Sequence, residues 1–313
     1  MALTSRIAFD DLSTTEEAED YLGSSLGVIF PDDVMNQHGD ADSSLVYTSP
    51  HLPNPLHIVL ADPKAADDRA LFGHHLWNSS LLLAEFVEAG TLGLPYSVGS
   101  DIRVRGDGDT QPYGSIVRDF DIKELSSIEL GAGTALPSIL ASLLDAKAVV
   151  VTDYPSQVLM DTLRKNVETN CTTGYSPVST LTRPTVVGHA WGELDTEFAV
   201  QHKHSFDRVF VCDCLWMPWQ HLNLQKSIAH FMKGDESARA WVIGGLHTGR
   251  SKMRGFFEQT ALQQQGLEVE RIWERDCDGV ERPWNEDRGI EDVTERKRWL
   301  IVGVLKRSAA AKR

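Results

Sequence analysis

Apolar residues in the second half of the chain form short continuous runs separated by longer amphipathic stretches. The run at 148–153 is typical of a buried strand, and the stretch at 155–170 has the period of a helix. This alternation predicts an α/β fold with a mostly parallel sheet covered by helices on both faces. We expect strands at 127–130, 148–153, 185–191, 206–212, 240–243, 267–273 and 299–305, and helices at 136–144, 155–170, 222–232 and 252–265.

The last predicted strand follows a polar stretch, 276–298, that has no clear helical pattern. A parallel neighbour needs a crossover connection, usually a helix. We therefore expect this strand to enter the sheet antiparallel, as the seventh and last.

The first third of the chain has a different pattern, and we expect it to add a segment to the α/β domain. Residues 71–89 predict a strong amphipathic helix. The other expected features are a helix at 4–23, an irregular, partly extended arm at 30–68, a mobile loop at 97–114 and a frayed tail at 308–313. The predicted division is an N-terminal helix and arm on or near the active site (1–70), a main domain (71–307) and the tail.

A glycine turn joins the first predicted strand to the first helix. Gly131 and Gly133 allow the backbone to approach a ligand where side chains would block it. The third glycine of a dinucleotide site is replaced by Leu136, and Glu129 precedes the turn. Asp153 ends the next strand, 22 positions after Gly131, where a carboxylate can bind both hydroxyls of a ribose. Together they predict a site for an adenosine-bearing cofactor; the alternative is a tight turn beside a solvated acid.

Two more predicted strands end in residues that belong to the same edge of the sheet. Trp191 follows the third strand and Asp213 the fourth. Ligands of open α/β sheets bind outside the carboxyl ends of the strands. We expect Asp213 to lie over the reactive end of the cofactor; the alternatives are a packed tryptophan and a capping aspartate.

Charge and length narrow the classes of partner. The 313 residues carry a net charge of −15, which disfavours binding to nucleic acid or to anionic lipid. No apolar stretch reaches the length of a membrane span, and the acidic N-terminus lacks the layout of a signal peptide. We expect a protein of the cytosol or nucleus.

Cysteine and histidine spacing predicts neither a disulfide framework nor a metal site. Cys212 and Cys214 flank one residue of an apolar run, without the second ligand pair of a zinc site. The neighbouring side chains of His74 and His75 would lie on different faces of a helix. His221 is different, because it follows the Asp213 segment and is a candidate for the mouth of the pocket.

Four segments together resemble the fungal elongation-factor methyltransferases, which are often called nicotinamide N-methyltransferase-like and are related to the seven-strand lysine methyltransferases. The resemblance extends over most of 71–306. It is carried by the Leu-Phe-Gly-His-His-Leu-Trp-Asn string at 71–78, the glycine turn at 129–137, Thr-Asp-Tyr-Pro at 152–155 and Ala-Trp-Gly at 190–192.

The resemblance implies a Rossmann-like methyltransferase fold that uses S-adenosylmethionine. It implies that Trp77 and the glycine turn contact the methionine end of the cofactor, Asp153 the ribose and Trp191 the adenine region. Asp213 would face the accepting amine. The predicted cofactor-binding residues are Trp77, Glu129, Gly131, Gly133, Asp153, Tyr154 and Trp191. The sequence departs from the pattern after Asp213, where 214–221 is unusually aromatic, and in its long first 70 residues.

Methyl transfer to an amine requires a free lone pair on nitrogen. At pH 7 an α-amine of pKa about 7.7–8.0 is about one-tenth neutral, whereas lysine, at about 10.4, is neutral in fewer than about one in a thousand copies. Lysine would therefore need a desolvating aromatic cage, which Trp216, Trp219 and Tyr154 could build unless they only pack. We expect Asp213 to hold the amine, and Trp216, Trp219 and His221 to bind the substrate.

The leading hypothesis is an enzyme that methylates a protein N-terminal or lysine amine, with an elongation factor as the expected substrate and with no metal, membrane or nucleic acid involved. The main alternative is a methyltransferase for a small molecule, nicotinamide-like or from a secondary pathway. A non-catalytic binding module is disfavoured by the intact Gly131, Gly133 and Asp153, and an NAD-dependent oxidoreductase is disfavoured by Leu136.

Overall fold

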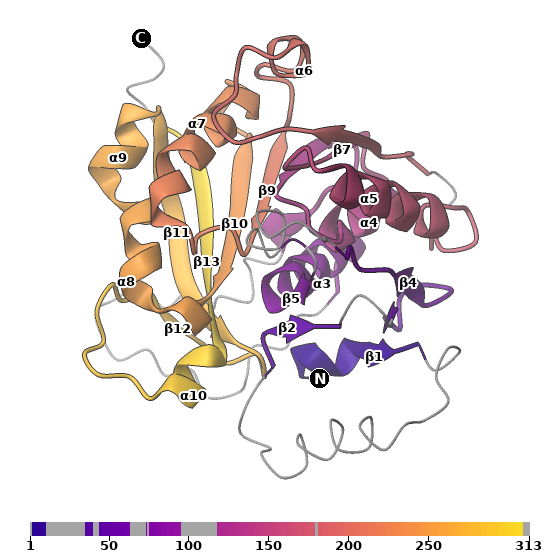
Figure 1. Cartoon of the computed structure of the whole chain (residues 1–313), viewed down its shortest axis with the longest axis horizontal. Coiled ribbons are helices and arrows are strands. Elements are labelled where there is room, and N and C mark those ends of the chain that lie inside the picture. Colours follow the sequence, from indigo (N-terminus) through magenta and orange to yellow (C-terminus); the bar gives the residue numbers. More distant parts are fainter. Residues whose placement is uncertain are drawn as a thin grey trace.

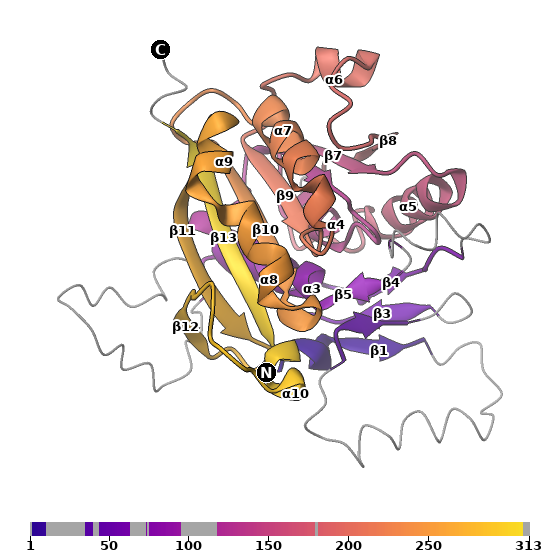
Figure 2. The same ribbon diagram turned by 60° about the vertical axis from the view of Figure 1, so that its left-hand side comes forward.

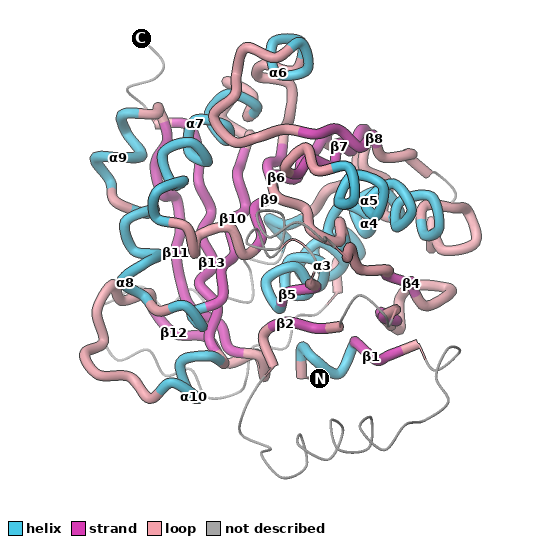
Figure 3. The backbone as a smooth tube through the Cα atoms, in the orientation of Figure 1, coloured by secondary structure: helices cyan, strands magenta, loops and turns pink. Residues whose placement is uncertain are grey.

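The centre of the molecule is an eight-stranded sheet with the order β12-β11-β13-β10-β9-β6-β7-β8. Figure 1 shows the sheet, and Figure 3 also labels β6 and β8. The structure is a computed structural model that describes residues 2–10, 35–39, 44–62, 73, 75–94, 118–178 and 181–308. The strands are β6 (Ser126–Leu130), β7 (Ala148–Asp153), β8 (Thr185–Gly188), β9 (Arg208–Cys212), β10 (Arg239–Gly245), β11 (Leu267–Asp276), β12 (Glu281–Pro283) and β13 (Trp299–Arg307).

The strand pairing is mostly parallel, as the sequence predicts. Strands β8, β7, β6, β9 and β10 are parallel neighbours, and β13 lies antiparallel between β10 and β11. The prediction of seven strands is wrong by one for this sheet. The polar stretch 276–298 contains a short extra strand, β12, which pairs antiparallel with β11. The chain passes from β6 to β7 and β8 and then returns to β9 on the other side of β6. This reversal between β6 and β9 is where open α/β sheets bind ligands.

Helices cover both faces of the sheet, which Figure 2 and the tube in Figure 3 show from two directions. One core contains α3 (Asn78–Leu92), α4 (Leu136–Leu143) and α5 (Gln157–Asn170) with Phe210 and Cys212. The other contains α7 (His221–Phe231), α8 (Arg250–Met253) and α9 (Gln259–Gln264) with Val209 and Val211. Because successive residues of β9 point to opposite faces, the nearly continuous apolar run supplies both cores.

Two predicted helices have other bounds than the pattern indicated. The helix predicted at 71–89 begins only at Asn78, after the short strand β5 (Leu76–Trp77), and α3 is buried nearly all round. The helix predicted at 252–265 is broken into α8, a 3-10 turn (Arg254–Phe257) and α9. Phe256 and Phe257 are both buried, although neighbours on a regular helix point about 100° apart. Other short helices are α6 (Glu197–Gln201), α10 (Val293–Lys297) and 3-10 turns at Leu3–Arg6, 118–120, Pro218–Gln220 and Leu246–Thr248.

The described part of the N-terminal segment forms strands that pack on the α/β domain. The helix predicted at 4–23 is wrong for residues 4–9, because a 3-10 turn at Leu3–Arg6 leads into β1 (Ile7–Phe9). This strand forms a sheet with β3 (Leu45–Tyr47) and β4 (Leu56–Ile58), so part of the predicted irregular arm is regular structure. The side chains of Asn166 and Asn170 on α5 hydrogen-bond the backbone of residues 57 and 59 and hold the sheet against the main domain.

Some predicted features lie outside the described residues: the rest of the helix at 4–23, the loop at 97–114 and the tail beyond Ser308. Ser308 itself is not frayed, because it is buried and its backbone N–H donates to Gly266. Across the described ranges, no helix has both the length and the apolar character needed to cross a membrane.

Candidate functional site

A cavity of about 460 Å³ opens at the carboxyl ends of β6, β7, β8 and β9, at the reversal of strand order. This size is within the range of small-molecule and cofactor sites. Its wall brings together eight of the predicted site residues, namely Trp77, Gly131, Gly133, Asp153, Tyr154, Trp191, Asp213 and Trp216.

The glycine turn that joins β6 to α4 lies in the wall of the cavity. Gly131 and Gly133 have φ angles of 73° and 55°, in the left-handed region that other residues rarely adopt. A Cβ on Gly131 would lie 2.7 Å from Cys214 Sγ and 2.9 Å from Trp191 Cζ2. Because glycine has no Cβ, the backbone of the turn can lie this close to the side chains of Cys214 and Trp191.

Asp153 is fixed at the end of β7 by two backbone donors. Its Oδ2 accepts the Gly133 N–H at 2.7 Å and its Oδ1 accepts the Tyr154 N–H at 2.6 Å. Burial raises the pKa of Asp153 to about 6, and the two backbone N–H groups act in the opposite direction. Asp153 lines the cavity, and each of its oxygens can accept a second hydrogen bond, so the carboxylate can accept from a ligand diol without losing its support.

The turn after β8 presents Trp191 to the cavity. The Gly192 N–H donates to Ser227 Oγ at 2.9 Å, and the same hydroxyl is hydrogen-bonded to His189 Nε2 at 3.2 Å. Gly192 has a φ of 86°, and a Cβ there would lie 2.8 Å from the side chain of Asn223. Helix α7, which carries Ser227 and Asn223, therefore positions the tryptophan through its neighbours.

Asp213 lies after β9 with its carboxylate buried in the cavity wall. Its φ of 54° is unusual for a residue other than glycine, although aspartate tolerates this region better than most. Ser79 Oγ donates to Oδ2 at 2.9 Å and the Gly245 N–H donates to Oδ1 at 3.3 Å. Burial raises the pKa of Asp213, opposed first by the nearby His247 and then by these two hydrogen bonds.

Trp77 reaches the cavity because the N-terminal segment holds strand β5. Strand β2 (Gln37–His38) pairs with β5, with Gln37 opposite Trp77. The next residue, Asn78, donates its backbone N–H to Asn36 O at 3.0 Å and is hydrogen-bonded through Oδ1 to His38 Nε2 at 2.7 Å. The ring of Trp77 stacks on that of His247, with centroids 5.0 Å apart and planes 13° apart.

Three of the predicted site residues lie outside the cavity wall. Glu129 is fully buried, and its Oε2 accepts the Ser138 N–H at 3.2 Å and the Ser138 Oγ–H at 2.5 Å. Burial raises its pKa to about 8, so Glu129 is mostly protonated at neutral pH.

The other two residues outside the cavity wall are Trp219 and His221. The side chain of Trp219 is 71% exposed, and its ring meets that of Trp216 edge to face. His221 Nε2 is hydrogen-bonded to the backbone oxygen of Leu215.

Several residues that sequence reasoning missed also belong to the site. Ser79 donates a hydrogen bond to Asp213, and His247 Nε2 lies 4.0 Å from Oδ1 of the same carboxylate. Ser80 and His75 line the cavity. The two serines directly follow the Leu-Trp-Asn string at 76–78, so the sequence could have indicated that they belong to the site. His247 follows β10 and belongs to no recognisable motif.

Cys212 and Cys214 also line the cavity, but burial raises the pKa of both thiols well above its ordinary value. They are therefore protonated and poor nucleophiles. Among the described residues, no group of three or more His, Cys, Asp or Glu side chains has the arrangement of a metal site.

Comparison with known proteins identifies a family model and several relatives that match this chain. A family model described as lysine methyltransferase matches residues 65–263. A protein of Gibberella zeae named "Protein N-terminal and lysine N-methyltransferase EFM7" is 29% identical over 236 residues, which are 72% of this chain and 75% of that protein. Its namesake in Schizosaccharomyces pombe is 26% identical, over 66% of this chain and 68% of that protein.

Solved structures show the same fold at low sequence identity. A putative SAM-dependent methyltransferase from Streptococcus mutans superposes with a TM-score of 0.50 and 10% identity, covering 92% of this chain and 65% of that one. A putative methyltransferase complexed with SAH gives the same TM-score, identity and coverage. The α/β methyltransferase fold expected from the sequence is thereby confirmed.

Proposed function

Because the chain belongs to the lysine methyltransferase family, we propose that it transfers the methyl group of S-adenosylmethionine to an amine of a protein, at an N-terminus or a lysine side chain. The names of the two fungal relatives, which specify both kinds of amine, support this proposal. The single structural observation that carries it is the cavity that joins Asp153 to the buried carboxylate of Asp213.

The residues that line the cavity of about 460 Å³ fit the cofactor. Asp153 would accept the ribose hydroxyls, since it lines the cavity and backbone donors orient both of its oxygens. Trp191 would pack against the adenine, and the open turn at Gly131 and Gly133, with Trp77, would contact the methionine end. We assign Tyr154 to the same wall. Glu129 would act beneath the turn through Ser138.

When bound, S-adenosylmethionine supplies a methyl group already activated by its sulfonium, so the protein contributes mainly alignment and exclusion of water. Asp213 would accept an N–H of the amine, with Ser79 and Gly245 holding its carboxylate in place. Trp77 and Trp216 would exclude water beside it. A negative carboxylate also stabilises the positive charge of the methylated amine.

We propose a translation elongation factor as the substrate protein and residues 71–307 as the catalytic domain. The first suggestion rests on the resemblance carried by the strings at 71–78 and 152–155. The second rests on the family match, which begins at residue 65. Residues 1–70 would then form an accessory segment beside the active site, a role supported by the pairing of β2 with β5 next to Trp77.

A labelling experiment tests the proposed reaction. Purified protein is incubated with methyl-labelled S-adenosylmethionine and an extract of Schizosaccharomyces pombe cells that lack the relative described above. We expect label in the protein fraction, in a band that peptide mapping identifies as an elongation factor methylated on nitrogen. Label found only among small molecules would contradict the proposal and support the small-molecule alternative.

A further inference from the structure

Another cavity, of about 700 Å³, lies at the opposite edge of the central sheet from the cavity that contains Asp153. It is lined by Arg208 and Arg239, the first residues of the parallel strands β9 and β10, and by Leu125, the residue before β6. We call it the amino-edge cavity. Among the described residues, none lines both this cavity and the proposed active-site cavity at the carboxyl ends of the strands.

Strand pairing brings the polar side chains of the amino-edge cavity to one face of the sheet. Arg208 lies directly opposite Arg239 in the parallel pair of β9 and β10, and Trp241 is two residues after Arg239. Trp241 is opposite Val304 of β13, which in turn is opposite Arg271 of β11. Because paired residues, and residues two apart on one strand, share a face, these side chains project to the same side of the sheet.

Three buried N–H groups of this wall lack a hydrogen-bond partner within the described part of the chain. They are Arg208 Nε, Trp241 Nε1 and Arg271 Nε. Both hydrogen bonds of Arg208 leave from Nη1, to the backbone oxygens of Asp207 at 2.9 Å and Ser237 at 2.8 Å. Buried donors without an acceptor destabilise a fold and are uncommon. Since all three groups are donors, a ligand that matches them must be rich in acceptors.

The amino-edge cavity is basic although the whole chain is acidic. Five of its lining residues are Arg or Lys and three are Asp or Glu, whereas the chain carries a net charge of −15. Arg239 is paired with Glu270 through two hydrogen bonds of 2.7 and 2.8 Å, and Arg271 is paired with Asp119. Burial, followed by repulsion from Arg239, lowers the pKa of Arg208. A bound anion would counteract both effects.

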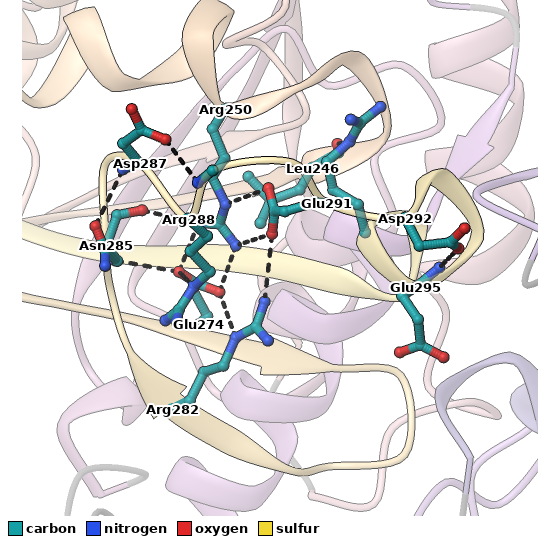
Figure 4. A network of polar contacts seen from close by, with 12 residues as sticks. Leu246, Arg250, Glu274, Arg282, Asn285, Asp287, Arg288, Glu291, Asp292 and Glu295 are labelled. Carbon is teal, nitrogen blue, oxygen red and sulfur yellow. Dashed lines mark hydrogen bonds and ion pairs between the residues drawn. The ribbon is translucent and has the colours of Figure 1, made fainter.

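Arg208 differs in this respect from the most strongly paired arginine of the described chain, which Figure 4 shows. Arg250 binds Glu274 through two hydrogen bonds of 2.6 and 2.8 Å and Glu291 through two of 2.7 and 3.0 Å. Buried charges in proteins are usually compensated in this way. The printed hydrogen bonds of Arg208 reach only backbone oxygens, so its guanidinium keeps N–H groups for an external acceptor.

We propose that the amino-edge cavity binds an oxyanion, the phosphate or carboxylate group of a small molecule, through Arg208 and Trp241. Arginine is the side chain best suited to such groups, because its planar fork of donors matches their oxygens. Arg208 Cζ lies 5.3 Å from the centroid of the Trp241 ring, so the two residues are close enough to contact one ligand. The basic residues around them would attract the anion. This site is separate from the proposed methyl transfer and does not depend on it.

Calorimetric titration of the whole chain with inorganic phosphate, and separately with citrate, tests the proposal at constant ionic strength. We expect at least one of these anions to bind with a Kd below about 1 mM. Arg208→Gln should weaken this binding at least about tenfold, and Trp241→Phe, which keeps a ring but removes the Nε1–H donor, at least about threefold. Arg164→Gln is the matched control, because Arg164 is an exposed arginine of α5, and it should bind like the wild type.

The two probes identify the group that the site takes, since phosphate alone, citrate alone or both can bind. The titrations are repeated with S-adenosylhomocysteine present, and the affinities should not change, because the two cavities lie at opposite edges of the sheet. Competition with S-adenosylhomocysteine would overturn the proposal, as would the failure of both anions to bind or an Arg208→Gln variant with undiminished affinity. If Arg208→Gln does not fold, Trp241→Phe decides, and unchanged binding there overturns the proposal.

Discussion

The backbone N–H of Gly133 donates a hydrogen bond of 2.7 Å to Oδ2 of Asp153, which joins the glycine turn after β6 to the acid at the end of β7. These residues are 20 positions apart in the chain and form one unit of the cavity wall. A change in the backbone of the turn will therefore also change the orientation of the carboxylate. We therefore expect the turn to be a sensitive point for the proposed binding of the cofactor.

Gly131→Ala should impair both stability and cofactor binding. At its φ of 73° the left-handed backbone costs a residue with a Cβ about 1–2 kcal/mol, and the new methyl would collide with Cys214 and Trp191. We expect S-adenosylhomocysteine to bind at least about tenfold more weakly, measured by calorimetry, because Trp191 is displaced.

Gly93→Ala is the matched control for this substitution. Gly93 has a similar φ of 64°, but a Cβ there would meet nothing within 4 Å. It should lower the free energy of unfolding by about 1–2 kcal/mol and leave cofactor affinity unchanged. Equal affinities of the Gly131 and Gly93 variants would show that the close contact with Trp191 is irrelevant to binding.

Glu129→Gln should make stability less sensitive to pH. Glu129 has a pKa near 4.5 in the unfolded chain and about 8 in the folded one, because burial disfavours the carboxylate. Between these values the folded protein holds a proton that the unfolded chain has lost, so the free energy of unfolding falls as pH rises. The effect is complete above about pH 8, when both states are ionised.

The neutral glutamine does not contribute this dependence. Thermal unfolding at pH 6 and pH 9 should therefore show the variant gaining stability relative to the wild type at the higher pH, by about 1 kcal/mol or more. A constant difference between the two proteins over this range would mean that Glu129 is already ionised in the folded state at pH 6.

Asp213→Asn should slow methylation while preserving the cofactor site. Asparagine also tolerates the left-handed backbone and keeps the size of the side chain, but it removes the negative charge that we propose lies beside the amine. We expect a decrease of at least about tenfold in the rate of protein methylation and little change in affinity for S-adenosylhomocysteine. Turnover equal to the wild type would remove Asp213 from the reaction.

The sequence predicted the parallel part of the fold well, because a buried parallel strand leaves a nearly continuous apolar run. The runs that became β7 and β9 were located in this way. Local pattern could not show that Asn78 begins α3 after a strand, since β5 exists only through its pairing with β2, about 40 residues earlier. The hairpin strand β12 was missed because its three residues carry no apolar alternation.

The sequence indicated site residues that directly follow a strand. It did not indicate residues that reach the site only through the packing of distant segments. Asp153 and Asp213 follow β7 and β9 to the same edge, and both line the cavity. His247 reaches Asp213 because β10 lies beside β9, which is a relation between strands and not a motif. His221 follows Asp213 closely in sequence, but in α7 it binds the backbone of Leu215 and lies outside the cavity wall.

The central claim is that S-adenosylmethionine binds across the tips of β6 and β7 with its ribose on Asp153, and calorimetric titration with S-adenosylhomocysteine tests it most directly. The wild type should bind, Asp153→Ala should bind at least about tenfold more weakly, and Asp161→Ala, which removes an exposed acid on α5, should bind like the wild type. A folded wild type with no affinity for the cofactor product, or an Asp153→Ala variant with undiminished affinity, would contradict the account.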